Sequence, residues 1–137
     1  MKSESYYYSQ TPPLLCAELI KHIPDLTESD VIFEPFAGEG NFVKVFQDSQ
    51  NVITTDIENG TDYKSVNLDE AGIDWVVTKP PFQIGDQDET ETEFYKLADY
   101  FAGKTNKGFC FLANEKCFLE LSPKNLKNLY ETKGIYI

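Results

Sequence analysis

The chain has 137 residues, with 23 acidic against 12 basic side chains and a formal net charge of -11. This length predicts one domain, residues 1–137, with a buried core, and it leaves no room for a separate target-recognition domain. All the basic residues are lysines, and tight duplex binding normally depends on a cationic surface, so the composition argues against tight nucleic-acid binding by the chain alone.

The cysteine and histidine content predicts neither a disulfide framework nor a metal site. Cys16, Cys110 and Cys117 show no paired CxxC spacing, so we expect reduced thiols. His22 is the single histidine, and we expect it near a helix C-terminus. No apolar run approaches the length of a membrane span and no signal-peptide pattern opens the chain, which leads us to expect a cytoplasmic protein.

Apolar spacing and turn residues predict helices and strands in alternation. A helix is expected from Thr11, whose hydroxyl would cap it, to about Ile23, where Pro24 ends it. A further helix is expected after the glycines at 38 and 40. Short apolar runs predict strands at residues 31–33, 51–55, 74–78, 108–113 and 134–137, and helical spacing predicts helices at 90–101 and 125–131. This alternation predicts an α/β fold whose parallel sheet is covered on both faces.

A glycine turn after the first strand is the strongest ligand-binding signal. Gly38 and Gly40 would let the backbone approach a ligand closely. Asp56 follows at the end of the next strand, at a spacing where an acid accepts hydrogen bonds from a ribose. A dinucleotide and an adenosyl cofactor both fit this pattern. Val43 stands where a dinucleotide site has its third glycine, and the Glu34 carboxylate would repel a pyrophosphate but pair with the amino end of a methionine moiety, so the adenosyl group is favoured.

Four segments of the chain resemble, in order, the motifs of the γ-type adenine-specific amino-methyltransferases: residues 8–12, 33–42, 55–57 and 78–82. The resemblance extends from about residue 6 to the end. It implies a Rossmann-like, doubly wound, mostly parallel sheet, S-adenosyl-L-methionine as cofactor, and a DNA or RNA substrate. The residues that it assigns to the cofactor are Thr11, Glu34, Pro35, Phe36, Ala37, Gly38, Gly40, Asp56, Ile57, Asp62 and Tyr63. For Asp62 a role as a turn residue is an equal alternative.

The catalytic motif of the family departs from its usual form in this chain. The family has Asn or Asp, then two prolines and an aromatic residue, and the matching residues here are Lys79, Pro80, Pro81 and Phe82. The polar side chain accepts a bond from the target amino group, and the aromatic ring stacks on the flipped base. A lysine ammonium only donates, and it would repel the cofactor's sulfonium, although a neutral lysine would not.

The sequence therefore leaves the activity open between two classes of protein. One is a methyltransferase of DNA or RNA adenine amino groups. The other is a methyltransferase-like scaffold without catalysis, which would hold a protein partner or a second copy of itself. A glutamine-directed protein methyltransferase is a third reading, less favoured because the Thr11-Pro12 segment fits the adenine type. The last predicted strand, residues 134–137, would correspond to the sixth strand of the family fold, and the chain ends there without an antiparallel seventh strand. Activity would therefore require a partner, a simple substrate or residues beyond Ile137.

Overall fold

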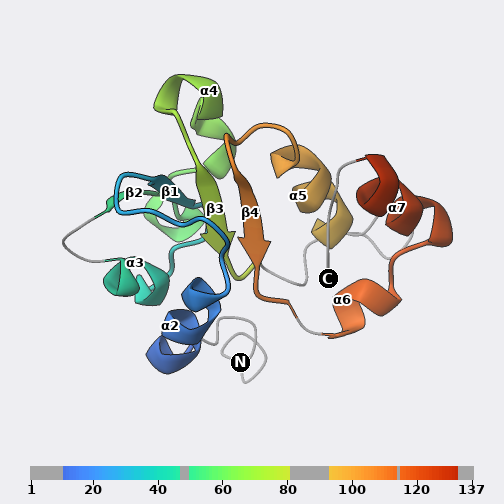
Figure 1. The fold of residues 1–137 in the computed structure, drawn as a ribbon, viewed down its shortest axis with the longest axis horizontal. Coiled ribbons are helices and arrows are strands. Elements are labelled where there is room, and N and C mark those ends of the chain that lie inside the picture. Colours follow the sequence, from blue (N-terminus) through green and yellow to red (C-terminus); the bar gives the residue numbers. More distant parts are fainter. Residues whose placement is uncertain (1–10, 47–49, 81–92, 114, 133–137) are drawn as a thin grey trace.

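The computed structural model describes residues 11–46, 50–80, 93–113 and 115–132. Four strands form one sheet in the order β2-β1-β3-β4, and every neighbouring pair is parallel (Figure 1). The strands are β1 (Val31–Glu34), β2 (Asn51–Thr54), β3 (Trp75–Thr78) and β4 (Gly108–Phe111). The predicted α/β class with a parallel sheet is confirmed. The strand predicted at 134–137 lies outside the described residues.

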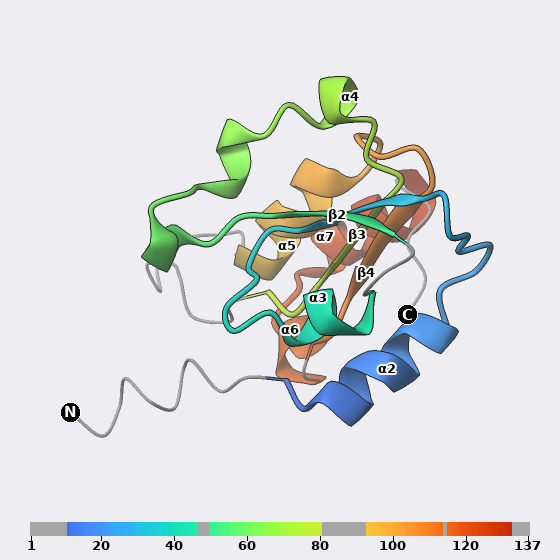
Figure 2. The ribbon, with the colours of Figure 1, turned by 90° about the vertical axis from the view of Figure 1, so that its left-hand side faces the viewer.

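Helices cover both faces of this sheet, as predicted. The α-helices are α2 (Pro13–Lys21), α3 (Asn41–Val45), α4 (Leu68–Ala71), α5 (Glu93–Phe101), α6 (Glu115–Leu119) and α7 (Pro123–Lys127). Short helical turns are η1 (Ile57–Asn59), η2 (Tyr63–Ser65) and η3 (Asn128–Thr132), of which the last is π-helical. Figure 2 shows α2 and α3 on one side of the strands, with α5 on the other.

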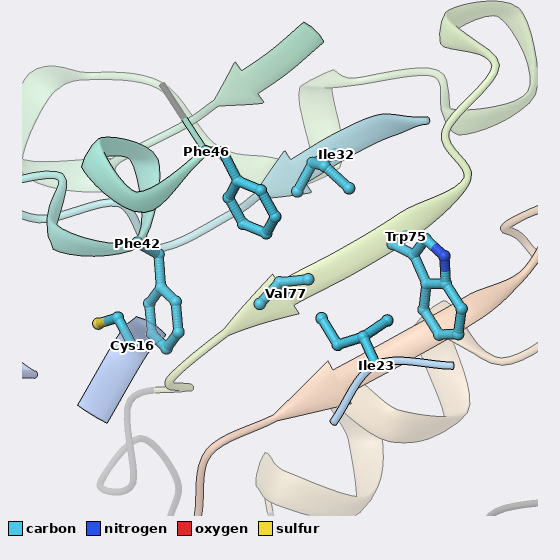
Figure 3. Close-up of a cluster of buried hydrophobic side chains, with 7 residues drawn as sticks. All are labelled: Cys16, Ile23, Ile32, Phe42, Phe46, Trp75 and Val77. Carbon is cyan, nitrogen blue, oxygen red and sulfur yellow. The ribbon is translucent and has the colours of Figure 1, made fainter. Parts of the chain in front are cut away.

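The core consists of two layers because successive strand residues point to opposite faces. Ile32, Trp75 and Val77 face α2 and α3, where they pack with Cys16 and Phe42 (Figure 3). The alternate strand residues Phe33 and Val76 face the other way and pack with Leu97 and Phe101 of α5. Burial on both faces explains why the central strands β1 and β3 read as apolar runs in the sequence.

The start of α2 differs from the prediction. The helix begins at Pro13, Pro12 occupies the N-cap position with φ -57° and ψ 138°, and no side chain caps the helix. A residue before proline is disfavoured in the helical region, so Pro13 forces Pro12 out of the helix and moves Thr11 beyond the capping position. Instead, the Thr11 carbonyl accepts a hydrogen bond from Asn41 Nδ2 at 2.7 Å. At the other end His22 is the C-cap, as expected.

The C-terminal helical region also begins earlier than predicted. Ser122 caps α7 by accepting from the Asn125 N–H at 3.1 Å, and Pro123 is the first helical residue. This cap and proline pair is the usual helix start, which spacing of apolar residues alone does not reveal. The strand β4 ends at Phe111, two residues before its predicted end, and α5 begins at Glu93 within its predicted range.

The strand order creates a topological switch point at the carboxyl ends of β1 and β3. From β1 the chain passes through α3 to β2 on one side, and from β3 it passes through α5 to β4 on the other side. Ligands of open parallel sheets bind outside the carboxyl ends of the strands at such a point. The last residues of these two strands are Glu34 and Thr78.

Candidate functional site

The turn after β1 depends on two glycines in the left-handed backbone region. Gly38 has φ 55° and Gly40 has φ 80°. Such angles cost residues with a Cβ about 1–2 kcal/mol. Gly40 is the N-cap residue of α3, and its N–H donates to the Ala37 carbonyl at 2.8 Å. The glycines thus allow the chain to reverse between β1 and α3 with its backbone accessible at Gly38.

Thr55 ties this turn to the end of β2. Its N–H donates to the Glu34 carbonyl at 3.1 Å, and its hydroxyl donates to the Pro35 carbonyl at 2.9 Å. The Ala37 N–H in turn donates to the Thr55 carbonyl at 3.1 Å. Because these bonds join the carboxyl ends of two neighbouring strands, the turn and Asp56 hold a fixed relation to one another.

The Asp56 carboxylate points at the glycine turn. Its Oδ2 accepts from the Gly38 N–H at 2.7 Å, and its Oδ1 accepts from the Glu58 N–H at 2.9 Å, which caps η1. The Thr61 hydroxyl fixes the Asp56 backbone by accepting from its N–H at 2.9 Å. A carboxylate has about four acceptor positions, so two backbone bonds leave capacity for hydroxyl groups of a ligand.

An open hollow of about 510 Å³ lies beside this carboxylate. Small-molecule sites usually measure roughly 300–1,000 Å³. Four of the predicted cofactor residues line it: Ala37, Gly38, Gly40 and Asp56. The other lining residues are Glu39, Val43, Lys44, Thr54, Thr55, Asn59 and Thr61. The hollow therefore joins the glycine turn to the segment after β2, the two parts that the sequence predicts to act together.

Glu34 lies behind the turn and is 2% exposed. Its Oε1 accepts from the Phe36 N–H at 2.9 Å. Burial raises the pKa of this carboxyl to about 8, the Asp56 charge adds to the rise, and the Thr78 hydroxyl and the Phe36 N–H oppose it. Within the described residues the Thr78 hydroxyl is close to Glu34 but completes no hydrogen bond of good geometry. The predicted carboxylate is therefore mostly a neutral acid at pH 7.

The predicted cofactor residues at 35, 36, 57, 62 and 63 do not line the hollow. Pro35 is fully buried, and the Phe36 ring packs edge-on against Tyr63, with ring centroids 5.3 Å apart. Asp62 caps η2 by accepting from the Lys64 N–H at 2.9 Å, which is the turn role weighed as its alternative. Ile57 is exposed at the start of η1.

The other predicted positions lie around the switch point. Thr11 is buried at the start of α2, and its carbonyl binds the first residue of α3. Lys79 is half-buried directly after β3, and Pro80 is fully buried. Pro81 and Phe82 lie outside the described residues.

Three threonines that the sequence did not single out shape the site. Thr55 holds the turn, Thr61 holds Asp56, and Thr78 faces Glu34. The position of Thr55 just after β2 and of Thr78 at the end of β3 is a signal in retrospect, because only the carboxyl ends of parallel strands meet at the ligand-binding edge.

Comparison of the chain with protein-family models, curated proteins and solved structures found no match. In the part of the chain that the structure describes, no cluster of three or more His, Cys, Asp or Glu side chains could hold a metal ion. No helix among the same residues has the length and apolar character needed to cross a membrane. The cysteines found here, Cys16, Cys110 and Cys117, are free thiols.

The raised pKa of Glu34 predicts a pH-dependent stability that Glu34→Gln removes. A carboxyl whose pKa rises from 4.5 to about 8 on folding stabilises the protein fully below pH 4.5. That stabilisation is lost as the pH rises through about 8, by at most about 5 kcal/mol. In urea unfolding, the wild type should lose stability relative to Glu34→Gln as the pH increases across this window.

The control for this measurement is Asp69→Asn, at an exposed position on α4. The difference in the free energy of unfolding between Asp69→Asn and the wild type should stay constant over the same pH range. If the free energies of unfolding of the wild type and Glu34→Gln differed by the same amount at every pH, the neutral state of the buried carboxyl would be contradicted.

Proposed function

We propose that the chain is a Rossmann-like, S-adenosylmethionine-binding methyltransferase domain of the type that acts on the adenine amino group of DNA or RNA. The observation that carries this proposal is the Asp56 carboxylate, 2.7 Å from the Gly38 N–H at the edge of the hollow. This pair brings a ribose-binding acid next to a backbone that a ligand can approach. It lies at the carboxyl ends of parallel strands, where such ligands bind.

The polar groups of the hollow suit an adenosyl ligand. The Asp56 carboxylate retains acceptor capacity for the two ribose hydroxyls. The exposed backbone at Gly38 and Glu39 allows close approach of the methionine portion, because no side chain projects from Gly38. Asn59 and Thr61 add amide and hydroxyl groups to the same wall.

The charge distribution favours a cationic ligand over a dinucleotide. Among the described residues, Glu39, Asp56 and one basic residue, Lys44, line the hollow. The chain carries a net charge of -11. A pyrophosphate placed on the turn would face both carboxylates at close range, whereas the sulfonium and ammonium groups of S-adenosylmethionine would be attracted by them. Acidic surroundings of this kind therefore support the adenosyl cofactor.

The substrate side of the proposed site is the segment that follows β3. Lys79 and Pro80 lie directly after Thr78, at the same edge of the sheet as the glycine turn. Methyl transfer to an amino nitrogen needs no covalent enzyme intermediate, only correct placement of the nitrogen against the methyl group. A residue that accepts a bond from that nitrogen would place it, and an ammonium at Lys79 cannot do so.

Lys79 also supports a second candidate, a domain that binds the cofactor or a partner without catalysis. A lysine at the position of the accepting Asn or Asp removes the hydrogen bond that orients the base. The negative net charge further weakens nucleic-acid binding by the chain alone. Turnover by the isolated chain would eliminate this candidate.

Asp56→Asn should weaken cofactor binding in calorimetric titrations with S-adenosylmethionine and S-adenosylhomocysteine. The amide retains one acceptor oxygen but loses the charge, and hydrogen bonds to a charged group contribute about 1.5–3 kcal/mol, so the Kd should rise about 10- to 100-fold. Asp69→Asn is the matched control and should bind like the wild type. Wild-type protein that gives neither heat nor a thermal shift with these ligands would refute the proposed function.

Lys79→Asn should create or increase methyl transfer to adenine if this position alone blocks catalysis. The amide carbonyl can accept from the target amino group, and the cation near the sulfonium is removed. Transfer of a labelled methyl group to mixed DNA and RNA measures the effect, with Lys124→Asn on the exposed surface of α7 as control. Unchanged turnover in a variant that still binds the cofactor would show that Lys79 is not the block.

A further inference from the structure

Lys44, on α3, is the one basic side chain that the described residues place at the hollow. Its backbone N–H donates to the Gly40 carbonyl at 2.9 Å, which fixes it one helical turn after the glycine segment. Its ammonium donates to Asn41 Oδ1 at 3.3 Å, and within the described part of the chain it forms no ion pair. An ammonium has three donors, so two of them are left for a ligand.

Asn41 holds this ammonium at the hollow. Its Nδ2 donates to the Thr11 carbonyl at 2.7 Å, which leaves Oδ1 of the same amide to face Lys44. A lysine side chain loses much rotamer freedom when a ligand fixes it. The bond to Asn41 offsets part of that loss before a ligand arrives, so the exposed Lys44 is partly preorganised for an anion.

The charges around the hollow mirror those of the proposed cofactor. Glu39 and Asp56 bring two negative charges and Lys44 brings one positive charge. S-adenosylmethionine carries two positive charges, on its sulfonium and ammonium, and one negative charge, on its carboxylate. Such complementarity of charge gives specificity more than raw affinity. The ligand's one anionic group therefore has one candidate partner among the side chains that line the hollow.

We infer that Lys44 binds the carboxylate of the ligand's amino-acid portion and selects ligands that carry this group. The inference rests on the proposed function for the identity of that ligand. Binding of the ribose at Asp56 and of the carboxylate at Lys44 would hold the ligand to two segments of the chain, one after β2 and one on α3. Lys44 acts here through charge and hydrogen bonding alone, and no covalent bond forms or breaks.

Calorimetric titration with three ligands tests this assignment. S-adenosylhomocysteine carries the carboxylate. Its decarboxylated analogue keeps the amine but lacks the carboxylate, and 5′-methylthioadenosine lacks both groups. The Kd of the decarboxylated analogue divided by the Kd of S-adenosylhomocysteine measures what the carboxylate contributes to binding.

Lys44→Gln should lower this ratio about tenfold, because it removes one charge-assisted hydrogen bond. The Kd of 5′-methylthioadenosine should stay unchanged in the same variant, which shows that the nucleoside part of the site is intact. Lys44→Arg should keep the ratio of the wild type, because a guanidinium also donates to carboxylates. Lys124→Gln, on the exposed surface of α7, is the matched control and should behave as the wild type.

Two results would overturn the inference and leave the proposed function intact. One is an unchanged ratio in Lys44→Gln, and the other is an equal loss of affinity for all three ligands in that variant. Absence of binding of all three ligands by the wild type would overturn the inference and the proposed function together.

Discussion

The hydrogen bond from the Gly38 N–H to the Asp56 carboxylate, 2.7 Å long, is the interaction on which the site depends. It joins the turn after β1 to the segment after β2, two parts of the chain that lie 18 residues apart. The left-handed backbone at Gly38 directs its N–H toward the Asp56 carboxylate. The Thr55 hydroxyl also joins the two segments by its hydrogen bond to the Pro35 carbonyl. Without the bond between Gly38 and Asp56 the Thr55 bonds would still join the two segments, but the Asp56 carboxylate would no longer be held against the glycine turn.

The two acids of the site occupy contrasting environments. Asp56 is partly exposed and accepts from two backbone N–H groups. Glu34 is buried between the carboxyl ends of the central strands, where desolvation keeps it protonated at neutral pH. Asp56 lines the hollow, whereas Glu34 does not. The two acids therefore differ in both exposure and protonation state, although they end or follow neighbouring strands.

The sequence predicted the strands and the glycine turn because these features leave local signals. Strands buried on both faces read as apolar runs, and Gly38 and Gly40 are required where φ is positive. The prediction that Thr11 caps the first helix was wrong, because the conformational restriction that Pro13 places on Pro12 outweighs the capping preference of threonine. The neutral state of Glu34 could not be predicted, and neither could the proximity of Thr78 to it. Each depends on burial between strands that lie far apart in the chain.

A crystal structure with S-adenosylhomocysteine bound is the most direct measurement of the proposed site. The ribose hydroxyls should lie within hydrogen-bonding distance of the Asp56 carboxylate, beside the backbone of Gly38. Electron density for the nucleoside outside the hollow, or a ribose that leaves Asp56 bound only to the N–H groups of Gly38 and Glu58, would contradict the assignment.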